Sequence, residues 1–282
     1  TLMNLIGCLD KPNAGIYEIN GKNILGLNTA EGSNQIAALS IEQVSALSSV
    51  AVKVLTPSQV EALSVDAVLA LPPNVINVVS TSAFPSINSI AFSKLEPNQV
   101  AALSTAQIGV MTTKQISQLG FDQAGALLPT QIKKLADEVK YLSNEAISGL
   151  DPKVIKNVDF SVLTKEQINQ FTSEQAINFQ SNQISKLSPT TIKGLLAGQI
   201  EVMSPYAFKG ININVMPYLS TGAVEALQTT QITQFSSNQL EALSPKQVGH
   251  LSSDILETWL PNKGFSSILN DDSVSGGIET SH

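Results

Sequence analysis

The chain has 282 residues, a formal net charge of −7 and 14% charged residues, and all of its 16 basic residues are lysine. Arginine is the side chain best suited to bidentate phosphate and guanine contacts, so its absence and the acidic balance argue against a nucleic-acid partner. No apolar run reaches the roughly 18–20 residues of a membrane span, and one cysteine with two histidines offers few ligands for a metal, so we expect no membrane span, metal or cofactor.

The first part of the chain, residues 1–32, lacks the periodicity that follows it. Residues 2–9 resemble the end of an apolar helix, and residues 10–15 resemble a turn. Residues 16–19 alternate like a strand, and the Asn-Gly pair at 20–21 is typical of a tight hairpin turn. The sequence therefore predicts a small helix-strand fragment at residues 1–32.

From residue 33 to residue 261 the chain repeats every eight residues. With Leu39 as position one of this octad, every eighth residue is apolar as far as Leu135, and again from Leu163 to Trp259. Position six is apolar in most octads, so positions one and six are the predicted core positions. The predicted core includes Leu39, Val44, Leu47, Leu63, Leu103, Ile108, Leu163, Ile168, Leu187, Leu243 and Val248.

Each octad also carries the signals of a helix that begins anew. Position two is Ser, Thr, Asn or Asp in 19 of 28 octads, and position five is Gln in 14. Ser or Thr followed three residues later by Gln forms a capping box, and eight of the 13 prolines occupy position three, where a missing N–H costs nothing. The predicted capping pairs are Ser40 with Gln43, Ser104 with Gln107, Thr164 with Gln167, and Ser244 with Gln247.

The glutamines at position five have two further interpretations. They could form a ladder of amides between stacked octads, or an exposed polar strip that binds a partner. Because Ser or Thr stands at the matching spacing, we favour local capping.

The short helices must stack on one another. A single long helix is excluded because an eight-residue stripe would precess by about 80° per octad and the prolines would break it. Helices of about five or six residues are unstable alone in water, so their apolar positions must be buried by stacking. A β-solenoid is the alternative, but Ala, Glu, Gln and Lys between the caps favour helix. We predict an all-α solenoid, or superhelix, of short capped helices with an eight-residue repeat.

The octad is interrupted between residues 136 and 162. The step from Leu135 to Leu142 is one residue short, and five extra residues stand near 158–162. This interruption predicts a joint between two repeat blocks, with the extra residues as a bend or a bulge. Residues 262–282 are polar and rich in Gly, Ser and Asp, which is typical of a disordered tail.

The N-terminal fragment contains Thr-Leu-Met-Asn-Leu-Ile-Gly-Cys-Leu-Asp-Lys-Pro at 1–12, Ala-Gly-Ile-Tyr at 14–17 and Asn-Gly-Lys at 20–22. On these residues, residues 1–30 resemble part of an ABC-transporter ATPase of the macrolide and lipoprotein exporter type. The resemblance places the phosphate loop of that family immediately before Thr1, outside the sequence. We therefore expect a remnant that does not bind ATP.

The octads at 33–261 resemble the Leu-Ser-x-x-Gln-Val repeats of some large bacterial surface or secreted proteins. Neither this resemblance nor the residues point to a nucleophile with a base beside it, so we expect no catalytic residue and no enzyme activity. The favoured interpretation is a bacterial, non-catalytic repeat protein, secreted or at the cell surface. It would present an extended surface to a protein partner or serve a structural or adhesive role.

Two other functions remain open. The chain could be a fragment of an ABC-transporter ATP-binding protein fused to repeats. It could also bind an ordered polymer or ice through its Ser and Thr side chains, but capping hydroxyls point at their own backbone, which argues against this.

Overall fold

A computed structural model describes residues 18–19, 22–23 and 30–259, with side chains described from residue 32 to residue 257. Strands β1 (Glu18–Ile19) and β2 (Lys22–Asn23) pair antiparallel around residues 20–21, as the predicted hairpin requires. The predicted helix at 2–9 and the predicted tail at 262–282 lie outside the described residues.

From residue 30 onward the described chain is a succession of short helices. The α-helices are α2 (Ala30–Ala37), α3 (Ile41–Ser45), α4 (Ser49–Lys53), α5 (Pro57–Glu61), α6 (Val65–Leu69), α7 (Pro73–Ile76), α8 (Pro97–Ala102), α9 (Thr105–Ile108), α10 (Thr113–Ser117), α11 (Phe121–Gly125), α12 (Pro129–Leu135), α13 (Asn144–Gly149), α14 (Lys165–Gln170), α15 (Ser173–Ala176), α16 (Ser181–Ile184), α17 (Ala197–Val202), α18 (Thr221–Glu225), α19 (Thr229–Ile232), α20 (Ser237–Glu241), α21 (Pro245–Val248) and α22 (Ser253–Trp259). The 3-10 helices are η1 (Phe84–Ser86), η2 (Ser89–Ser93), η3 (Ala136–Tyr141), η4 (Pro152–Asn157), η5 (Phe160–Val162), η6 (Ile192–Gly194), η7 (Pro205–Gly210) and η8 (Ile213–Tyr218).

The octad that contains α9 shows how the sequence produces one repeat. Leu103 at position one is extended and buried, with φ −58° and ψ 133°. Ser104 at position two is also extended and caps the helix, which then runs from position three to position six. Positions one, five and six are buried here, while positions two, three, four and seven are exposed. This octad therefore contributes three residues to the core and four to the surface.

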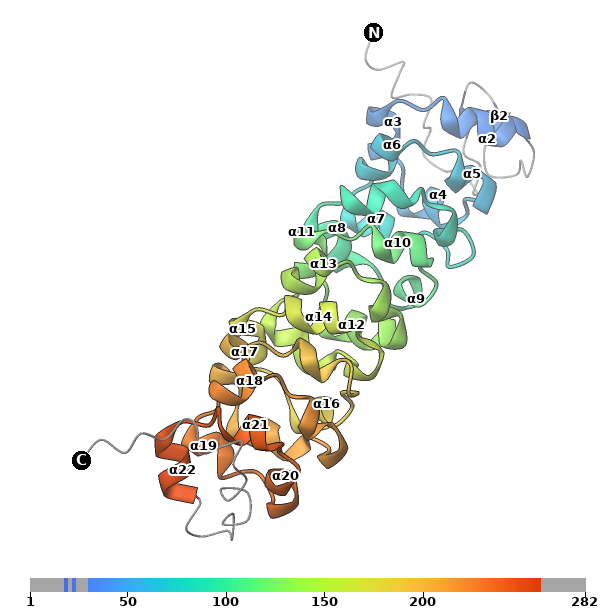
Figure 1. Ribbon diagram of the computed structural model, residues 1–282. Helices are drawn as coiled ribbons and strands as arrows, with labels where there is room; N and C mark the ends of the chain where they lie inside the picture. The colour runs from blue at the N-terminus through green and yellow to red at the C-terminus, as the bar shows by residue number, and fades with distance from the viewer. Residues whose placement is uncertain (1–17, 20–21, 24–29, 260–282) are drawn as a thin grey trace. The chain divides into compact units, whose positions relative to one another are not determined.

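The helices stack as a solenoid in two compact blocks, the first ending at Gly149 and the second beginning at Leu150. Helices three octads apart pack on each other: α8 on α11 in the first block, and α15 on α17 and α17 on α18 in the second (Figure 1). Hydrogen bonds between successive coils join residues 28 apart, which is three and a half octads. The predicted all-α solenoid is confirmed.

Ten of the eleven predicted core residues are at most 4% exposed: Val44, Leu47, Leu63, Leu103, Ile108, Leu163, Ile168, Leu187, Leu243 and Val248. Leu39 differs, because it is only half-buried. It is the first position-one residue of the array, so octads cover it from one side only. Position five is a third core position that the apolar pattern did not reveal, because half of its residues are glutamine.

In the first block, the one-residue shortening after Leu135 is absorbed by Ala136. Its φ of 47° is the only positive value of a non-glycine residue in the described part of the chain. Helix α12 continues through position one to Leu135, and Val139 in η3 is then fully buried in place of the usual position-six residue. Ala136, with its positive φ, therefore makes the connection between the two repeats that is one residue shorter than usual.

In the second block, residues 158–162 form a shortened repeat of their own, not a bend or a bulge. Val158 is buried at position one, and the Asp159 carboxylate accepts a hydrogen bond from the Ser161 N–H at 3.0 Å. The Phe160 ring packs on the rings of Phe171 and Phe179, with centroids 5.6 and 4.9 Å apart. One aromatic side chain thus fills the space that positions five and six fill elsewhere.

Candidate interaction surface

The four predicted capping pairs each form both hydrogen bonds of a capping box. In the octad of Ser104, the Ser104 N–H donates to Gln107 Oε1 at 2.9 Å, and the Gln107 N–H donates to Ser104 Oγ at 3.2 Å. The same two bonds join Ser40 with Gln43, Thr164 with Gln167, and Ser244 with Gln247. The glutamine side-chain oxygen is therefore used within its own helix.

The glutamine side-chain nitrogen acts on the preceding coil. Gln107 Nε2 donates to the carbonyls of Ile76 and Val79, at 2.9 and 3.0 Å. These carbonyls stand at positions six and one, where a short helix ends and leaves its last carbonyls without intrahelical partners. Such bonds are made by Gln99, Gln107, Gln115, Gln123, Gln131, Gln175, Gln183, Gln199, Gln231, Gln239 and Gln247.

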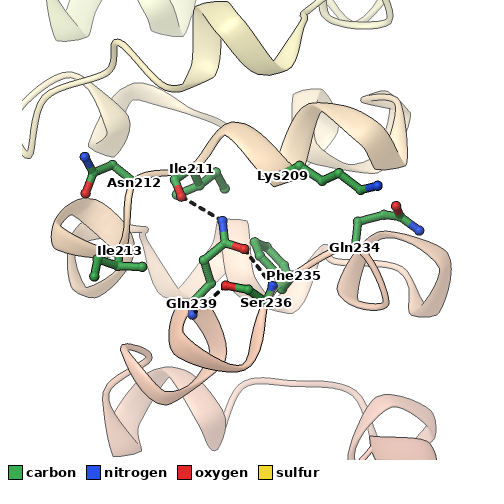
Figure 2. Close-up of a pocket in the computed structure, with 8 residues that line it drawn as sticks. All are labelled: Lys209, Ile211, Asn212, Ile213, Gln234, Phe235, Ser236 and Gln239. Atoms are coloured by element: carbon green, nitrogen blue, oxygen red, sulfur yellow. Dashed lines mark hydrogen bonds between the residues drawn. The ribbon is translucent and has the colours of Figure 1, made fainter.

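These eleven glutamines are at most 9% exposed, so the position-five column is not an exposed polar strip. Capping and an inter-coil ladder coexist in it, and the acceptors in the preceding coil are backbone carbonyls, not other amides. Figure 2 shows both roles in one residue: Gln239 Nε2 reaches the Ile211 carbonyl at 2.7 Å, and its Oε1 accepts from the Ser236 N–H at 2.7 Å. All of these glutamines except Gln123, whose helix α11 has no capping box, join the start of their own helix to the coil before it.

Glutamine at position five also distinguishes the α-helices from the 3-10 helices. All 14 position-five glutamines lie in α-helices, and none of the eight described 3-10 helices contains glutamine. Octads with Ala or Val at position five form either kind, as α6 and η7 show. A glutamine at position five is therefore a sequence signal for a full α-helical turn at that place.

The outer surface is hollowed where octads of successive coils meet. One hollow of about 370 Å³ is lined by Ile177 and Tyr206, whose side chains are 55% and 68% exposed, together with Asn178, Gln180 and Ser204. Another of about 530 Å³, drawn in Figure 2, lies between Asn212 and Gln234. Lys209 Nζ lies 5.1 Å from the centroid of the exposed Tyr206 ring, so a cation stands beside this ring.

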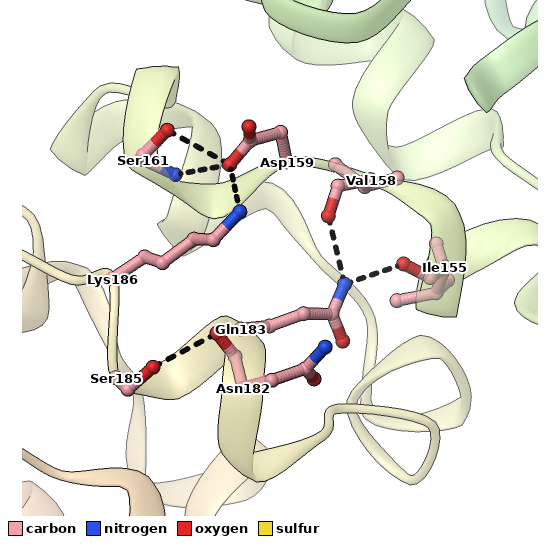
Figure 3. Close-up of polar contacts among 8 residues, drawn as sticks. All are labelled: Ile155, Val158, Asp159, Ser161, Asn182, Gln183, Ser185 and Lys186. Carbon is pink, nitrogen blue, oxygen red and sulfur yellow. Dashed lines mark hydrogen bonds and ion pairs between the residues drawn. The ribbon is translucent and has the colours of Figure 1, made fainter.

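Two carboxyl groups have altered acidity, and both belong to local turns. A hydrogen bond from the Ser40 hydroxyl lowers the pKa of Glu42. Partial burial raises the pKa of Asp159, but hydrogen bonds from Ser161 and the charge of Lys186, 3.1 Å away, outweigh it, so the pKa is lowered (Figure 3). Neither group is poised for proton transfer near neutral pH.

The described residues contain no group of three or more His, Cys, Asp or Glu side chains that could hold a metal ion. No helix within the described ranges has the length and apolar character needed to cross a membrane. The side chains that distinguish this surface are thus exposed aromatic, aliphatic and charged groups held on a repetitive frame.

Comparison with known proteins identifies the repeats. Residues 92–135, in the first block, and residues 217–253, in the second, match the family model of the ALTTAQ repeat, which confirms that this is a repeat protein. No curated protein and no solved structure matches the chain. Neither matched stretch reaches residues 1–30, so the resemblance of that segment to an ABC-transporter ATPase stays a prediction.

Proposed function

We propose that this chain is a non-catalytic binding protein that holds a protein partner on the outer face of its solenoid. The observation that carries the proposal is the hollow between Ile177 and Tyr206, called here the Tyr206 hollow. Two large apolar side chains that are more than half exposed line the same depression. Exposed tyrosine beside an aliphatic side chain is typical of the residues that dominate binding energy at protein interfaces.

The rest of the Tyr206 hollow fits the same role. Asn178, Gln180 and Ser204 supply amide and hydroxyl groups around the apolar pair, as the polar rim of an interface does. No carboxylate or histidine lines this hollow, so its chemistry supports binding and not acid–base catalysis. The resemblance of the octads to repeats of bacterial surface or secreted proteins adds a location outside the cell or at its surface.

The solenoid frame supports binding because it holds these side chains in fixed positions. Ile177 follows α15, and Tyr206 lies in η7, one coil later. The buried Gln183 lies on α16, the helix that packs on η7, and donates to the carbonyls of Ile155 and Val158 at 2.7 and 2.9 Å (Figure 3). A partner would therefore meet a preorganised surface, which lowers the entropy lost on binding.

The experiment is quantitative affinity capture with the full chain from an extract of its source, comparing three proteins. The test variant is Ile177→Ser with Tyr206→Ala, and the control is Ile90→Ser, which removes an equally exposed (52%) side chain from the first block. We expect the parent and the control to capture the same partner. The test variant should bind that partner with an affinity reduced about 30-fold or more and should fail to capture it. Thermal melting checks that all three proteins are folded. Equal capture by the test variant, or no specific capture by the parent, would overturn the proposal.

A further inference from the structure

The helix η7 borders two hollows of the outer surface. Tyr206 in η7 lines the Tyr206 hollow, and Lys209 in the same helix lines the second hollow, drawn in Figure 2. Helix η7 packs on α16, which brings Ser181 to the first hollow, and on α19, which is followed by Gln234 in the second. Figure 2 shows Lys209 at one side of the second hollow and Ile213 at the other. The two hollows together are called here the η7 site.

Exposed apolar side chains line both parts of the η7 site. Ile177 and Tyr206 in the first hollow are 55% and 68% exposed, and Ile213 in the second is 45% exposed. Amide side chains line the same two hollows, and they belong to Asn178, Gln180, Asn212 and Gln234. A partner can therefore make apolar contacts at two places, with polar groups beside each. This arrangement fits an extended segment that carries two apolar side chains.

One lysine lines each hollow, and no carboxylate lines either. Lys156 on η4 lines the first hollow, and Lys209 lines the second. Both side chains are exposed, and within the described residues neither forms an ion pair. Neighbouring helices do carry carboxylates, namely Glu174 on α15, Glu201 on α17 and Glu241 on α20, but these line neither hollow. The η7 site is therefore positively charged, although the block around it carries both signs.

One of the two lysines is restrained by the aromatic ring of the other hollow. Lys209 Nζ lies 5.1 Å from the Tyr206 ring centroid. A cation beside a ring loses less side-chain entropy when an opposite charge binds it. Because the ring lines the first hollow and the ammonium group the second, this pair joins the two parts of the site. A carboxylate that binds Lys209 thus brings its own chain close to the exposed face of Tyr206.

We infer that the η7 site binds an extended acidic segment of the partner protein. The carboxylates of the segment bind Lys156 and Lys209. Its apolar side chains pack against Ile177, Tyr206 and Ile213. The inference rests on the proposed binding role of the Tyr206 hollow and names the chemistry of the partner. Charge complementarity is the argument, because a basic segment would meet two lysines and no carboxylate in these hollows. The attraction acts between exposed charges, so salt must weaken it.

The test is selection of a phage-displayed library of random peptides on the immobilised full chain at low salt. The selected peptides are then synthesised and their affinities are measured by fluorescence anisotropy. The test variant is Lys156→Gln with Lys209→Gln. The matched control is Lys165→Gln with Lys246→Gln, which changes the net charge equally but removes exposed lysines that line neither hollow. Thermal melting checks that all three proteins are folded.

We expect the selected peptides to combine several Asp or Glu residues with apolar residues. The parent and the control should bind them equally, and the test variant about tenfold more weakly. Changing the acidic residues of a selected peptide to Asn and Gln should weaken binding to the parent by a similar factor. The same change should add little to the loss in the test variant, because the two changes remove one interaction.

Neutral or basic selected peptides, equal binding by the test variant and the control, or an empty selection would overturn the inference. Labelled heparin that binds the η7 site more tightly than every selected peptide would assign the site to an acidic polysaccharide and overturn it too. A partner captured through Ile177 and Tyr206 but indifferent to the two lysines would overturn this inference alone. If no partner is captured from the extract while acidic peptides still bind through the lysines, the proposed function fails and this inference stands.

Discussion

The glutamine ladder makes a sharp prediction at Gln115. Its Nε2 donates to the carbonyls of Phe84 and Ile87 at 3.1 and 3.0 Å, its Oε1 accepts from the Thr112 N–H at 2.9 Å, and the side chain is 1% exposed. Gln115 Nε2 also lies 3.3 Å from the Pro85 carbonyl, and the Phe84 carbonyl also accepts from the Ile87 N–H, so Gln115→Ala removes the hydrogen bonds of the Ile87 carbonyl, the Pro85 carbonyl and the Thr112 N–H. Each such group costs about 1–3 kcal/mol when buried, and water that enters the vacated space offsets part of that cost. We expect a loss of about 3 kcal/mol.

The assay is urea unfolding, followed by circular dichroism, with hydrogen exchange of the backbone amides around residue 115 as a local readout. Gln118→Ala is the control, because Gln118 lies in the same octad but its side chain is exposed. A change within about 0.5 kcal/mol is expected there. If the two variants lost the same stability, the inter-coil hydrogen bonds would not hold the coils together and the reasoning would be wrong.

Gln115→Glu separates the two roles of the amide. The variant keeps an oxygen for the Thr112 N–H but turns a second oxygen toward the two carbonyls. Burial beside carbonyl oxygens should raise the pKa of the new carboxyl, so the protonated form, which can donate, is the better fit. Relative to the parent, this variant should therefore be least stable near neutral pH and recover as the pH falls through its raised pKa.

Three further predictions concern single sites. Leu103→Asp places a carboxylate at a core position that is 4% exposed and should cost about 3 kcal/mol or more, so an unchanged melting temperature would contradict the core assignment. In Gly210→Ala the new Cβ would clash with the Ser181 carbonyl oxygen, so this variant should be destabilised by about 1–3 kcal/mol. Gly222→Ala, in helix α18 with no atom within 4 Å of the new Cβ, should be stabilised by up to about 1 kcal/mol, and urea midpoints compare the two variants. Asp159 has a folded pKa below its ordinary value, so it stabilises the fold above the unfolded pKa of 3.8 and loses this as pH falls through the folded pKa. Asp159→Asn should therefore flatten the acid limb of the stability curve by about 1 kcal/mol or less, because Lys186 is exposed.

What the sequence could predict was the local part of the fold. A repeat period, a cap at position two and an apolar residue at positions one and six involve residues less than ten apart, so they can be read along the chain. Ser104 and Gln107 illustrate this, because their mutual hydrogen bonds close within one octad.

The coil length could not be predicted in the same way. It depends on where Gln107 Nε2 finds its carbonyls, 28 and 31 residues back, and no local pattern encodes that distance. The shortened repeat at 158–162 was hidden for a related reason. It fits because Phe160 packs against Phe171 and Phe179, which are distant in sequence.

The glutamines connect these two periods. Their side-chain oxygen accepts a hydrogen bond from an N–H three residues earlier, within one octad. Their side-chain nitrogen donates to carbonyls at the end of a helix in the preceding coil. The coil adjusts where the octad changes: Gln175 reaches the Leu150 carbonyl across 25 residues, three fewer than usual, because a five-residue repeat replaces an octad between them. The hydrogen bond from the amide to its carbonyl is thus kept, and the number of residues in the coil changes instead. The same constraint acts on exposed positions, because Gln175 and Gln199 lie in α15 and α17, which pack together and place Glu174 and Glu201 on adjacent coils.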